Sequence, residues 1–178
     1  MKAIVFHEFG EPEVLKYEDV PMPEPGPNEA LVKVLAVAID YINLHVRRGG
    51  SGRVGSMSEP RYTKASKPFF TGGGACVEVV ALGPDVEGVA IGSQHLVHGV
   101  KPGSAVEFGT VNAELLRPRT DGRPGPTAIP PSFTPEQAAA FDYATVAYHT
   151  LKNHAGLSSG ETVLLHAAAG GTGSLAVQ

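Results

Sequence analysis

The residues best suited to chemistry form a glycine-rich run near the end of the sequence, Ala168-Ala169-Gly170-Gly171-Thr172-Gly173. The run matches the pattern G-x-G-x-x-G with alanine at the first position. Glycine lets the backbone approach a pyrophosphate, and the last glycine lets a helix pack closely on a strand. Phosphates bind at the amino end of such a helix, where free N–H groups and the helix dipole favour negative charge. The run therefore predicts a dinucleotide-binding loop, with an ordinary glycine turn as the alternative.

The segments before this loop supply the context that the motif requires. Thr162–His166 is apolar and follows a Gly-Glu turn, so we expect a strand that leads into the loop. Further upstream, Thr134 is placed to cap a helix, Pro135 suits its first position, and Gln137 completes a capping box. Apolar residues at helical spacing extend the predicted helix to Leu151. Together these segments predict a connecting helix and the opening of a Rossmann unit.

The rest of the chain favours strands and turns, because 22 glycines and 15 prolines divide it into short segments. Proline-rich stretches at 21–27 and 121–131 predict extended connectors. Strands are expected at 2–7, 11–18, 30–39, 76–83, 94–98 and 111–116. We expect a β-rich domain at 1–130, followed by the helix and the cofactor-domain start at 131–178.

The segment 47–68 has a composition of its own. Six basic residues stand against one acid, Glu59, and glycine and serine are frequent. A solvated loop is the favoured interpretation. A second interpretation is a positively charged rim of the active site that attracts an anionic cofactor. Nucleic-acid binding is the least favoured, because aromatic residues do not interleave with the basic ones.

Composition excludes several classes of protein. The net charge of -4 and the pI near 6.0 do not suggest a nucleic-acid or membrane-surface protein. Cys76 is the only cysteine, so neither an intrachain disulfide nor a four-cysteine zinc site can form. No apolar run approaches the length of a membrane span. We expect a cytoplasmic protein without nucleic-acid or membrane partners.

The segment Gly156–Gly173 resembles the start of the cofactor domain in zinc-independent, NADPH:quinone oxidoreductase-like members of the medium-chain dehydrogenase/reductase superfamily. It is also similar to polyketide-synthase enoyl reductase domains. Met1–Val5, the connector Pro23–Glu29 and the helix start Pro130–Ala140 are similar to the same superfamily. The resemblance implies a mainly β GroES-like barrel followed by the beginning of an α/β Rossmann domain.

The resemblance also implies that zinc is absent. Zinc-dependent relatives have a cysteine where this chain has Asp40, and a His-Glu pair where it has Gly73-Gly74. Catalytic zinc needs about three protein ligands. We therefore expect no metal site.

Three further residues match positions near the nicotinamide or the substrate in relatives. Zinc-free members carry the pattern V-N-x-x-D, which reads Ile39-Asp40-Tyr41-Ile42-Asn43 here, with the two polar residue types exchanged. The resemblance makes Asp40 and His45 the candidate catalytic residues, and it adds Thr145 to the cofactor site. For each of these three residues, the alternative is a purely structural role. Gly92-Ser93 replaces the usual Gly-Asp pair of the family.

The resemblance implies hydride transfer from a nicotinamide cofactor to a quinone or an enone. NADPH is favoured over NADH, which stays an alternative, and the resemblance allows a homodimer. The cofactor carries the chemistry, and the protein orients it and stabilises the developing oxyanion. An enoyl reductase for carrier-bound thioesters and a catalytically silent barrel that serves in binding or assembly are the alternatives. We expect activity of the full-length parent and none of the 178-residue chain by itself.

Overall fold

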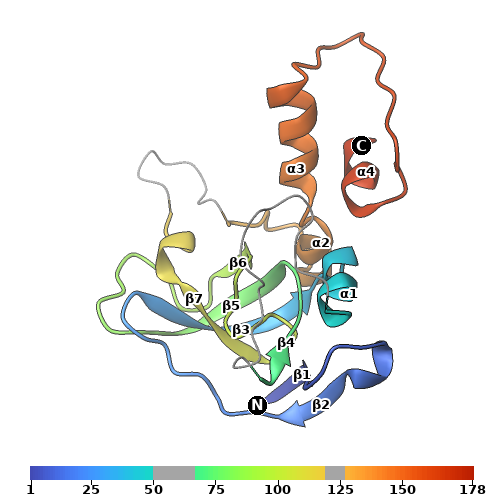
Figure 1. Ribbon diagram of the computed structural model, residues 1–178. Coiled ribbons are helices and arrows are strands. Elements are labelled where there is room, and N and C mark those ends of the chain that lie inside the picture. Colours follow the sequence, from blue (N-terminus) through green and yellow to red (C-terminus); the bar gives the residue numbers. More distant parts are fainter. Residues whose placement is uncertain (50–66, 119–126) are drawn as a thin grey trace. The chain divides into compact units, whose positions relative to one another are not determined.

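The structure is a computed structural model that describes residues 1–49, 67–118 and 127–178 (Figure 1). The chain forms two compact units, Met1–Ala139 and Ala140–Gln178. Most of the predicted basic loop at 47–68 and part of the predicted connector at 121–131 lie outside the described residues.

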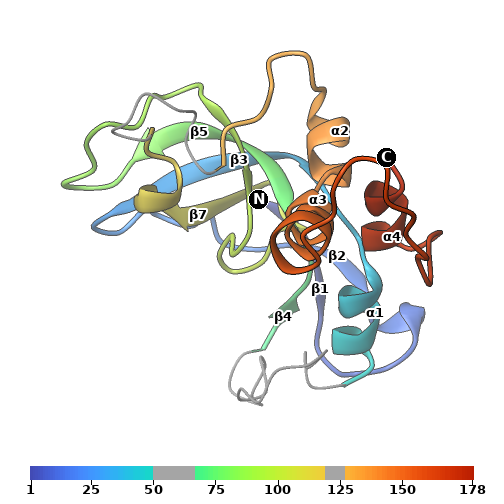
Figure 2. The same ribbon diagram turned by 90° about the horizontal axis from the view of Figure 1, so that it is seen from above.

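The first unit contains two antiparallel sheets. The smaller has the order β2-β1-β4, with β1 at Lys2–Phe6, β2 at Lys16–Asp19 and β4 at Phe69–Phe70. The larger has the order β6-β5-β3-β7, and Figure 2 shows β5 and β7 on either side of β3. Its strands are β3 (Glu29–Val37), β5 (Ala75–Leu82), β6 (Gln94–Val97) and β7 (Phe108–Asn112).

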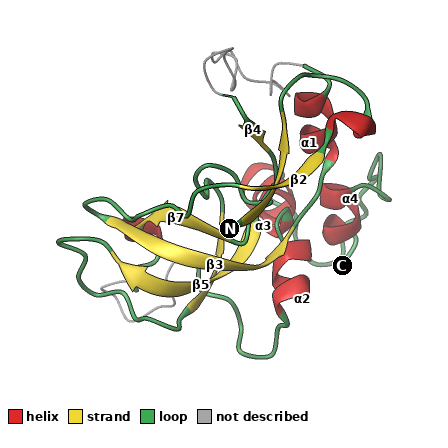
Figure 3. Ribbon diagram, turned by 90° about the horizontal axis from the view of Figure 1, so that it is seen from below, coloured by secondary structure: helices red, strands yellow, loops and turns green. Residues whose placement is uncertain are grey.

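The segment after Lys101 joins the two sheets. Ile4 donates its N–H to the Ala105 carbonyl at 2.9 Å, and Val34 of β3 donates to the Glu107 carbonyl at 2.9 Å. One connecting segment thus supplies partners to both sheets, and the strands close into the predicted GroES-like domain. Figure 3, coloured by secondary structure, shows β3 and β5 of the larger sheet side by side.

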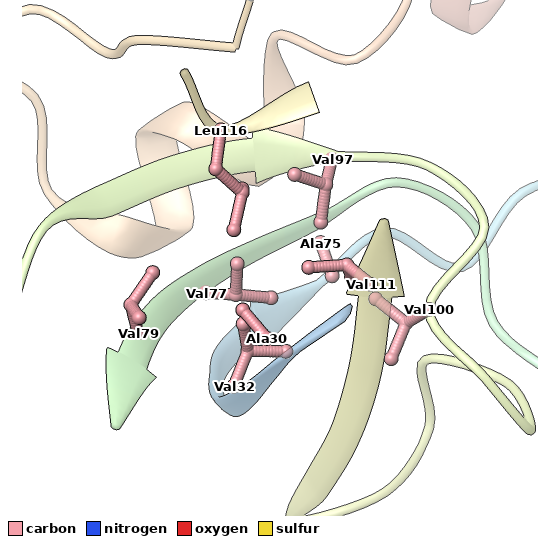
Figure 4. Close-up of a cluster of buried hydrophobic side chains, with 9 residues drawn as sticks. All are labelled: Ala30, Val32, Ala75, Val77, Val79, Val97, Val100, Val111 and Leu116. Atoms are coloured by element: carbon pink, nitrogen blue, oxygen red, sulfur yellow. The ribbon is translucent and has the colours of Figure 1, made fainter. Parts of the chain in front are cut away.

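Valine and alanine side chains fill the core of the larger sheet (Figure 4). Side chains alternate between the two faces of a strand, so Ala30 and Val32 share one face of β3, and Val77 and Val79 share one face of β5. These four are fully buried. β-branched residues suit such a pleated surface. The remaining core members come from other elements and are Ala75, Val97, Val100, Val111 and Leu116.

Two strand predictions need correction in the first unit. The segment 11–18 divides into a short 3-10 helix at Pro12–Val14 and β2. The segment 111–116 leaves the sheet after Asn112 and forms a 3-10 helix at Ala113–Leu115. There the Asn112 side chain accepts from the Glu114 N–H at 2.9 Å. This local bond offers the backbone an alternative to the strand ladder.

The connecting helix starts as predicted and is interrupted sooner. Thr134 and Gln137 form the reciprocal capping box, with bonds of 2.9 and 3.2 Å, and α2 spans Pro135–Ala140. The prediction of one continuous helix to Leu151 is wrong. Residues 141–143 form a turn, after which α3 (Ala144–Tyr148) leads into a π-helical segment, His149–His154. Asp142 lies in this turn, and aspartate competes with the backbone for hydrogen bonds within helices.

The predicted strand Thr162–His166 is not formed. The segment has no strand assignment, and Leu164 is 82% exposed. A strand exists only as part of a hydrogen-bonded ladder, and no strand among the described residues pairs with this segment. The last helix, α4, spans Gly171–Ala176 and begins inside the glycine run. None of the described helices is long and apolar enough to cross a membrane.

His95 on β6 provides a pH-dependent contribution to stability. Its ring contacts the Ser93 hydroxyl at 2.8 Å and the Thr127 hydroxyl at 3.0 Å, and burial lowers the pKa of this histidine. A lowered pKa in the folded state means that the unfolded state binds the proton more readily. The buried neutral ring therefore makes its full contribution to the free energy of unfolding above the unfolded pKa of about 6.5. This contribution is lost as the pH falls through the pKa of His95 in the folded state.

We expect the free energy of unfolding of the His95→Gln variant to depend less on pH below neutrality than that of the wild-type protein. Urea unfolding at pH 7.5 and at pH 5 measures this. Between the two pH values, the free energy of unfolding of the wild-type protein should fall more than that of the variant. The difference is at most about 1.4 kcal/mol per pH unit, which corresponds to one additional proton taken up when the wild-type protein unfolds. Equal losses in both proteins would contradict the assignment.

Candidate active site

Asp40 begins the helix that follows β3. This helix, α1, spans Tyr41–Arg47, and Asp40 is its N-cap. The carboxylate Oδ1 accepts from the Asn43 backbone N–H at 3.0 Å and from the Asn43 side-chain Nδ2 at 2.6 Å. Aspartate is a favoured N-cap, because its oxygen satisfies an N–H that has no partner within the helix. The candidate catalytic carboxylate is therefore held at a defined place by its own helix.

Asn43 connects this carboxylate to a segment far away in the sequence. Its side chain is buried, and its Oδ1 accepts from the Thr71 hydroxyl at 2.9 Å and from the Gly72 N–H at 2.7 Å. One amide therefore uses its nitrogen on Asp40 and its oxygen on the segment that follows β4. We call the side chains of Asp40 and Asn43 the carboxylate–amide pair.

The glycines beside this pair leave no space for larger residues. A Cβ atom at Gly73 would lie 2.9 Å from the Ala38 carbonyl oxygen and 3.1 Å from Asp40 Oδ2. At Gly72, which has a φ of +113°, it would lie 2.4 Å from Ser104 Oγ. Ser104 in turn donates to the Gly73 carbonyl at 2.6 Å. The backbone at these positions must stay close to its neighbours, which explains why glycine occupies them.

These residues do not fit a catalytic zinc site. The pair offers one carboxylate and one amide, and position 73 cannot carry a ligating side chain without a shift of the backbone. Within the described parts of the chain, no group of three His, Cys, Asp or Glu side chains is close enough to hold a metal ion. A catalytic zinc requires about three protein ligands.

His45, the second candidate catalytic residue, lies one helical turn after Tyr41. The two rings stack, with centroids 6.3 Å apart and planes inclined by 17°. Tyr41 is 71% exposed, and Ile39 and Leu44 are also exposed. The described hydrogen bonds do not join His45 to the carboxylate–amide pair. The start of α1 therefore combines a fixed carboxylate with an exposed apolar and aromatic surface.

The glycine run belongs to the second unit, and close contacts account for two of its glycines. A Cβ atom at Gly173 would lie 2.3 Å from the Ala167 carbonyl oxygen and 2.7 Å from Ala168 Cα. Ala167 has a φ of +56°, and its carbonyl accepts from the Gly170 N–H at 3.0 Å. A Cβ atom at Gly171 would lie 3.3 Å from the Tyr143 ring. The run is a tight turn into α4, as a phosphate-binding loop requires.

Thr145 lies in the same unit as this loop. It is an exposed residue of α3, and α3 packs against α4. The helix of Thr145 and the helix that begins in the glycine run are thus neighbours. The cofactor-binding residues proposed from sequence all belong to this unit, and Asp40 and His45 belong to the other.

Sequence reasoning placed Asn43 in a family motif without assigning it to the site, and it missed Thr71 and Ser104. Asn43 was recognisable, because an amide three residues after an N-cap aspartate can reach back to it. Thr71 and Ser104 carry no local signal, because they come from distant segments.

Cys76, the only cysteine, is buried in β5, and burial raises the pKa of its thiol, an effect that the Glu136 charge reinforces. This environment does not favour a nucleophilic thiolate.

The strands of the first unit form a domain of the GroES-like type. The family model described as "Alcohol dehydrogenase GroES-like domain" matches residues 26–125. The chain belongs to the medium-chain dehydrogenase/reductase superfamily, as a quinone oxidoreductase-like member.

Curated and solved relatives agree with this assignment. A quinone oxidoreductase from Pseudomonas aeruginosa is 31% identical over 99% of this chain and 48% of its own length. Prostaglandin reductase-3 from Bos taurus is 34% identical over 90% of this chain and 37% of its own length. A mycobacterial protein solved in complex with NADPH is similar at 30% identity with a TM-score of 0.74, covering 99% of this chain and 48% of that one. The chain thus spans half or less of the length of these relatives.

Proposed function

We propose that the protein is a zinc-free reductase that uses NADPH to reduce a quinone or an enone. The observation that carries the proposal is the tight glycine turn into α4, in which a Cβ atom at Gly173 would overlap the Ala167 carbonyl. Relatives named quinone oxidoreductase and prostaglandin reductase, and the similar structure that contains NADPH, support the choice of cofactor and acceptor.

Each candidate residue has a role in this proposal. The backbone of Ala168, Ala169, Gly170, Gly171, Thr172 and Gly173 would hold the pyrophosphate, and Thr145 would contact the nicotinamide side. When bound, NADPH supplies the hydride. Asp40 would accept a hydrogen bond from the carboxamide or from the substrate, and His45 would donate to the carbonyl oxygen of the acceptor. The apolar surface at the start of α1 would help to exclude water from the reacting groups.

The acceptor class can be tested with the protein as its gene encodes it. NADPH oxidation would be followed with benzoquinone, with a simple enone and with a carrier-bound enoyl thioester. We expect reduction of the quinone or the enone. Turnover of the thioester alone would favour the alternative of an enoyl reductase. No turnover and no NADPH binding would favour a silent barrel that acts in assembly.

Zinc independence is a separate expectation. It rests on the carboxylate–amide pair and on the absence of space for a side chain at Gly73. Elemental analysis of the purified protein, dialysed against a chelator, should find well below one zinc per chain. Near-stoichiometric zinc that survives this dialysis would refute the expectation.

A homodimer in the cytoplasm is proposed on the resemblance alone.

A further inference from the structure

The segment between β1 and β2 is attached to the end of α1. The Gly10 N–H donates to the Arg47 carbonyl at 3.0 Å. Arg48, which follows the helix, donates from Nη2 to Glu11 Oε2 at 3.0 Å. Val46 of the same helix is buried in an apolar cluster of the first unit. The backbone that carries the two arginines therefore has a defined position relative to the segment that carries Glu11.

Arg47 is a buried cation with an unused hydrogen-bond donor. Only 4% of the residue is exposed. Its Nη1 atom is buried and has no hydrogen-bond partner among the described residues. Its Nη2 atom lies 3.9 Å from Glu11 Oε2, which is too far for a hydrogen bond. Burial of a charged group is unfavourable unless the group is paired and hydrogen-bonded, so this guanidinium is suited to a further acceptor.

Glu11 satisfies one of the two neighbouring arginines and leaves the other with a poor contact. The same oxygen, Oε2, lies 3.0 Å from Arg48 Nη2 and 3.9 Å from Arg47 Nη2. Two guanidinium groups thus converge on a single carboxylate oxygen. The Glu11 side chain is 63% exposed, and an exposed ion pair contributes little to stability. Glu11 can therefore leave this position at small cost, and a better acceptor can take its place.

We propose that Arg47 and Arg48 form an anion site for a phosphate group, with Glu11 as the internal carboxylate that the phosphate displaces. A phosphate monoester carries about two negative charges at neutral pH and three strong acceptor oxygens. It can place separate oxygens against both guanidinium groups, and arginine pairs well with phosphate in this way. The partial negative charge at the end of α1 opposes an anion, but two full positive charges exceed it.

The composition of the neighbouring sequence favours the same ligand class. Arg47 and Arg48 begin the segment 47–68, in which six basic residues stand against one acid. An excess of positive charge raises the local concentration of anions. The proposed site itself requires only the two arginines and Glu11. It goes beyond the proposed reduction, because it uses neither the glycine run nor the candidate catalytic residues.

Replacing Glu11 is the sharpest test, because the loss of this side chain should strengthen binding. Inorganic phosphate would be titrated calorimetrically into the NADPH-free protein as its gene encodes it, at constant ionic strength. We expect Glu11→Gln to bind phosphate about tenfold more tightly than the wild-type protein, since the site is no longer occupied from within. Arg48→Gln should bind about tenfold more weakly or not at all. Arg48 is 58% exposed, so this variant should fold normally, and its thermal midpoint checks this.

Glu114→Gln is the matched control for the change in net charge. Glu114 forms an ion pair with Arg117 elsewhere on the surface of the first unit. Its replacement removes the same charge and exposes an arginine, but no second guanidinium shares this carboxylate among the described ion pairs. Phosphate affinity should stay at the wild-type value. Equal strengthening in Glu114→Gln and Glu11→Gln would show a general charge effect and would overturn the site.

Two further ligands determine what the site recognises. Acetate has one charge, like the Glu11 carboxylate, and should bind at least tenfold more weakly than phosphate. Acetate binding as tight as phosphate binding would overturn the assignment to phosphate. Glycerol 3-phosphate separates the sources of the group, because tighter binding than that of inorganic phosphate indicates a phosphate-bearing ligand and equal binding indicates free phosphate. Absence of phosphate binding in both the wild-type protein and Glu11→Gln would refute the proposal.

Discussion

Replacing Gly171 by aspartate is expected to weaken NADPH binding about 100-fold or more, which corresponds to about 2.7 kcal/mol. Gly171 is the first residue of α4, and a Cβ atom there would already lie 3.3 Å from the Tyr143 ring. A longer side chain would occupy the space through which a phosphate approaches the backbone, and its charge would repel the phosphate. Calorimetric titration of NADPH with the protein as its gene encodes it measures the effect.

Two companion variants separate the causes of this loss. Gly171→Ala adds the Cβ atom without the charge and should weaken binding less than the aspartate does. Ser159→Asp places the same charge on an exposed residue of the same unit and should leave binding close to the wild-type value. An unchanged dissociation constant in Gly171→Asp would show that this loop is not the phosphate site.

Replacing Gly72 by alanine is expected to lower the free energy of unfolding by about 2–6 kcal/mol. Two costs combine at this position. A φ of +113° is strained for any residue with a Cβ atom, by about 1–3 kcal/mol. In addition, the new atom would lie 2.4 Å from Ser104 Oγ and 2.7 Å from the Ala105 nitrogen, and such overpacking costs about 1–3 kcal/mol. Urea unfolding measures the sum.

Gly88 provides the matched control for this substitution. It has a φ of +74°, and a Cβ atom there would have no neighbour within 4 Å. Gly88→Ala therefore carries the conformational cost alone, about 1–2 kcal/mol. If the two variants were equally destabilised, the close packing of Gly72 against the Ser104 segment would make no contribution to stability.

Local signals in the sequence predicted the first unit and the start of the connecting helix well. The segments that form β3 and β5 each contain three valines, and the capping box at Thr134 and Gln137 is complete within four residues. The strand at 162–166 failed for a physical reason. An apolar run shows only that a segment can form a strand, whereas the strand itself requires a partner.

The candidate site likewise combines a local feature that the sequence predicts with contacts between distant segments that it does not predict. The helix start at Asp40 could be predicted, because an N-cap is a local feature. Its connection through Asn43 to Thr71 could not, because 28 residues separate these two side chains in the sequence. The close contact of Gly72 with Ser104 likewise depends on two segments that only the fold brings together.

The most direct test of zinc-free hydride transfer is the stoichiometry of a single reaction. The protein as its gene encodes it would be freed of metal by dialysis against a chelator and then mixed with NADPH and benzoquinone. We predict that NADPH is oxidised in a one-to-one ratio with hydroquinone formed, at a rate that added zinc does not change. Failure to oxidise NADPH, or turnover that appears only when zinc is restored, would contradict the proposed function.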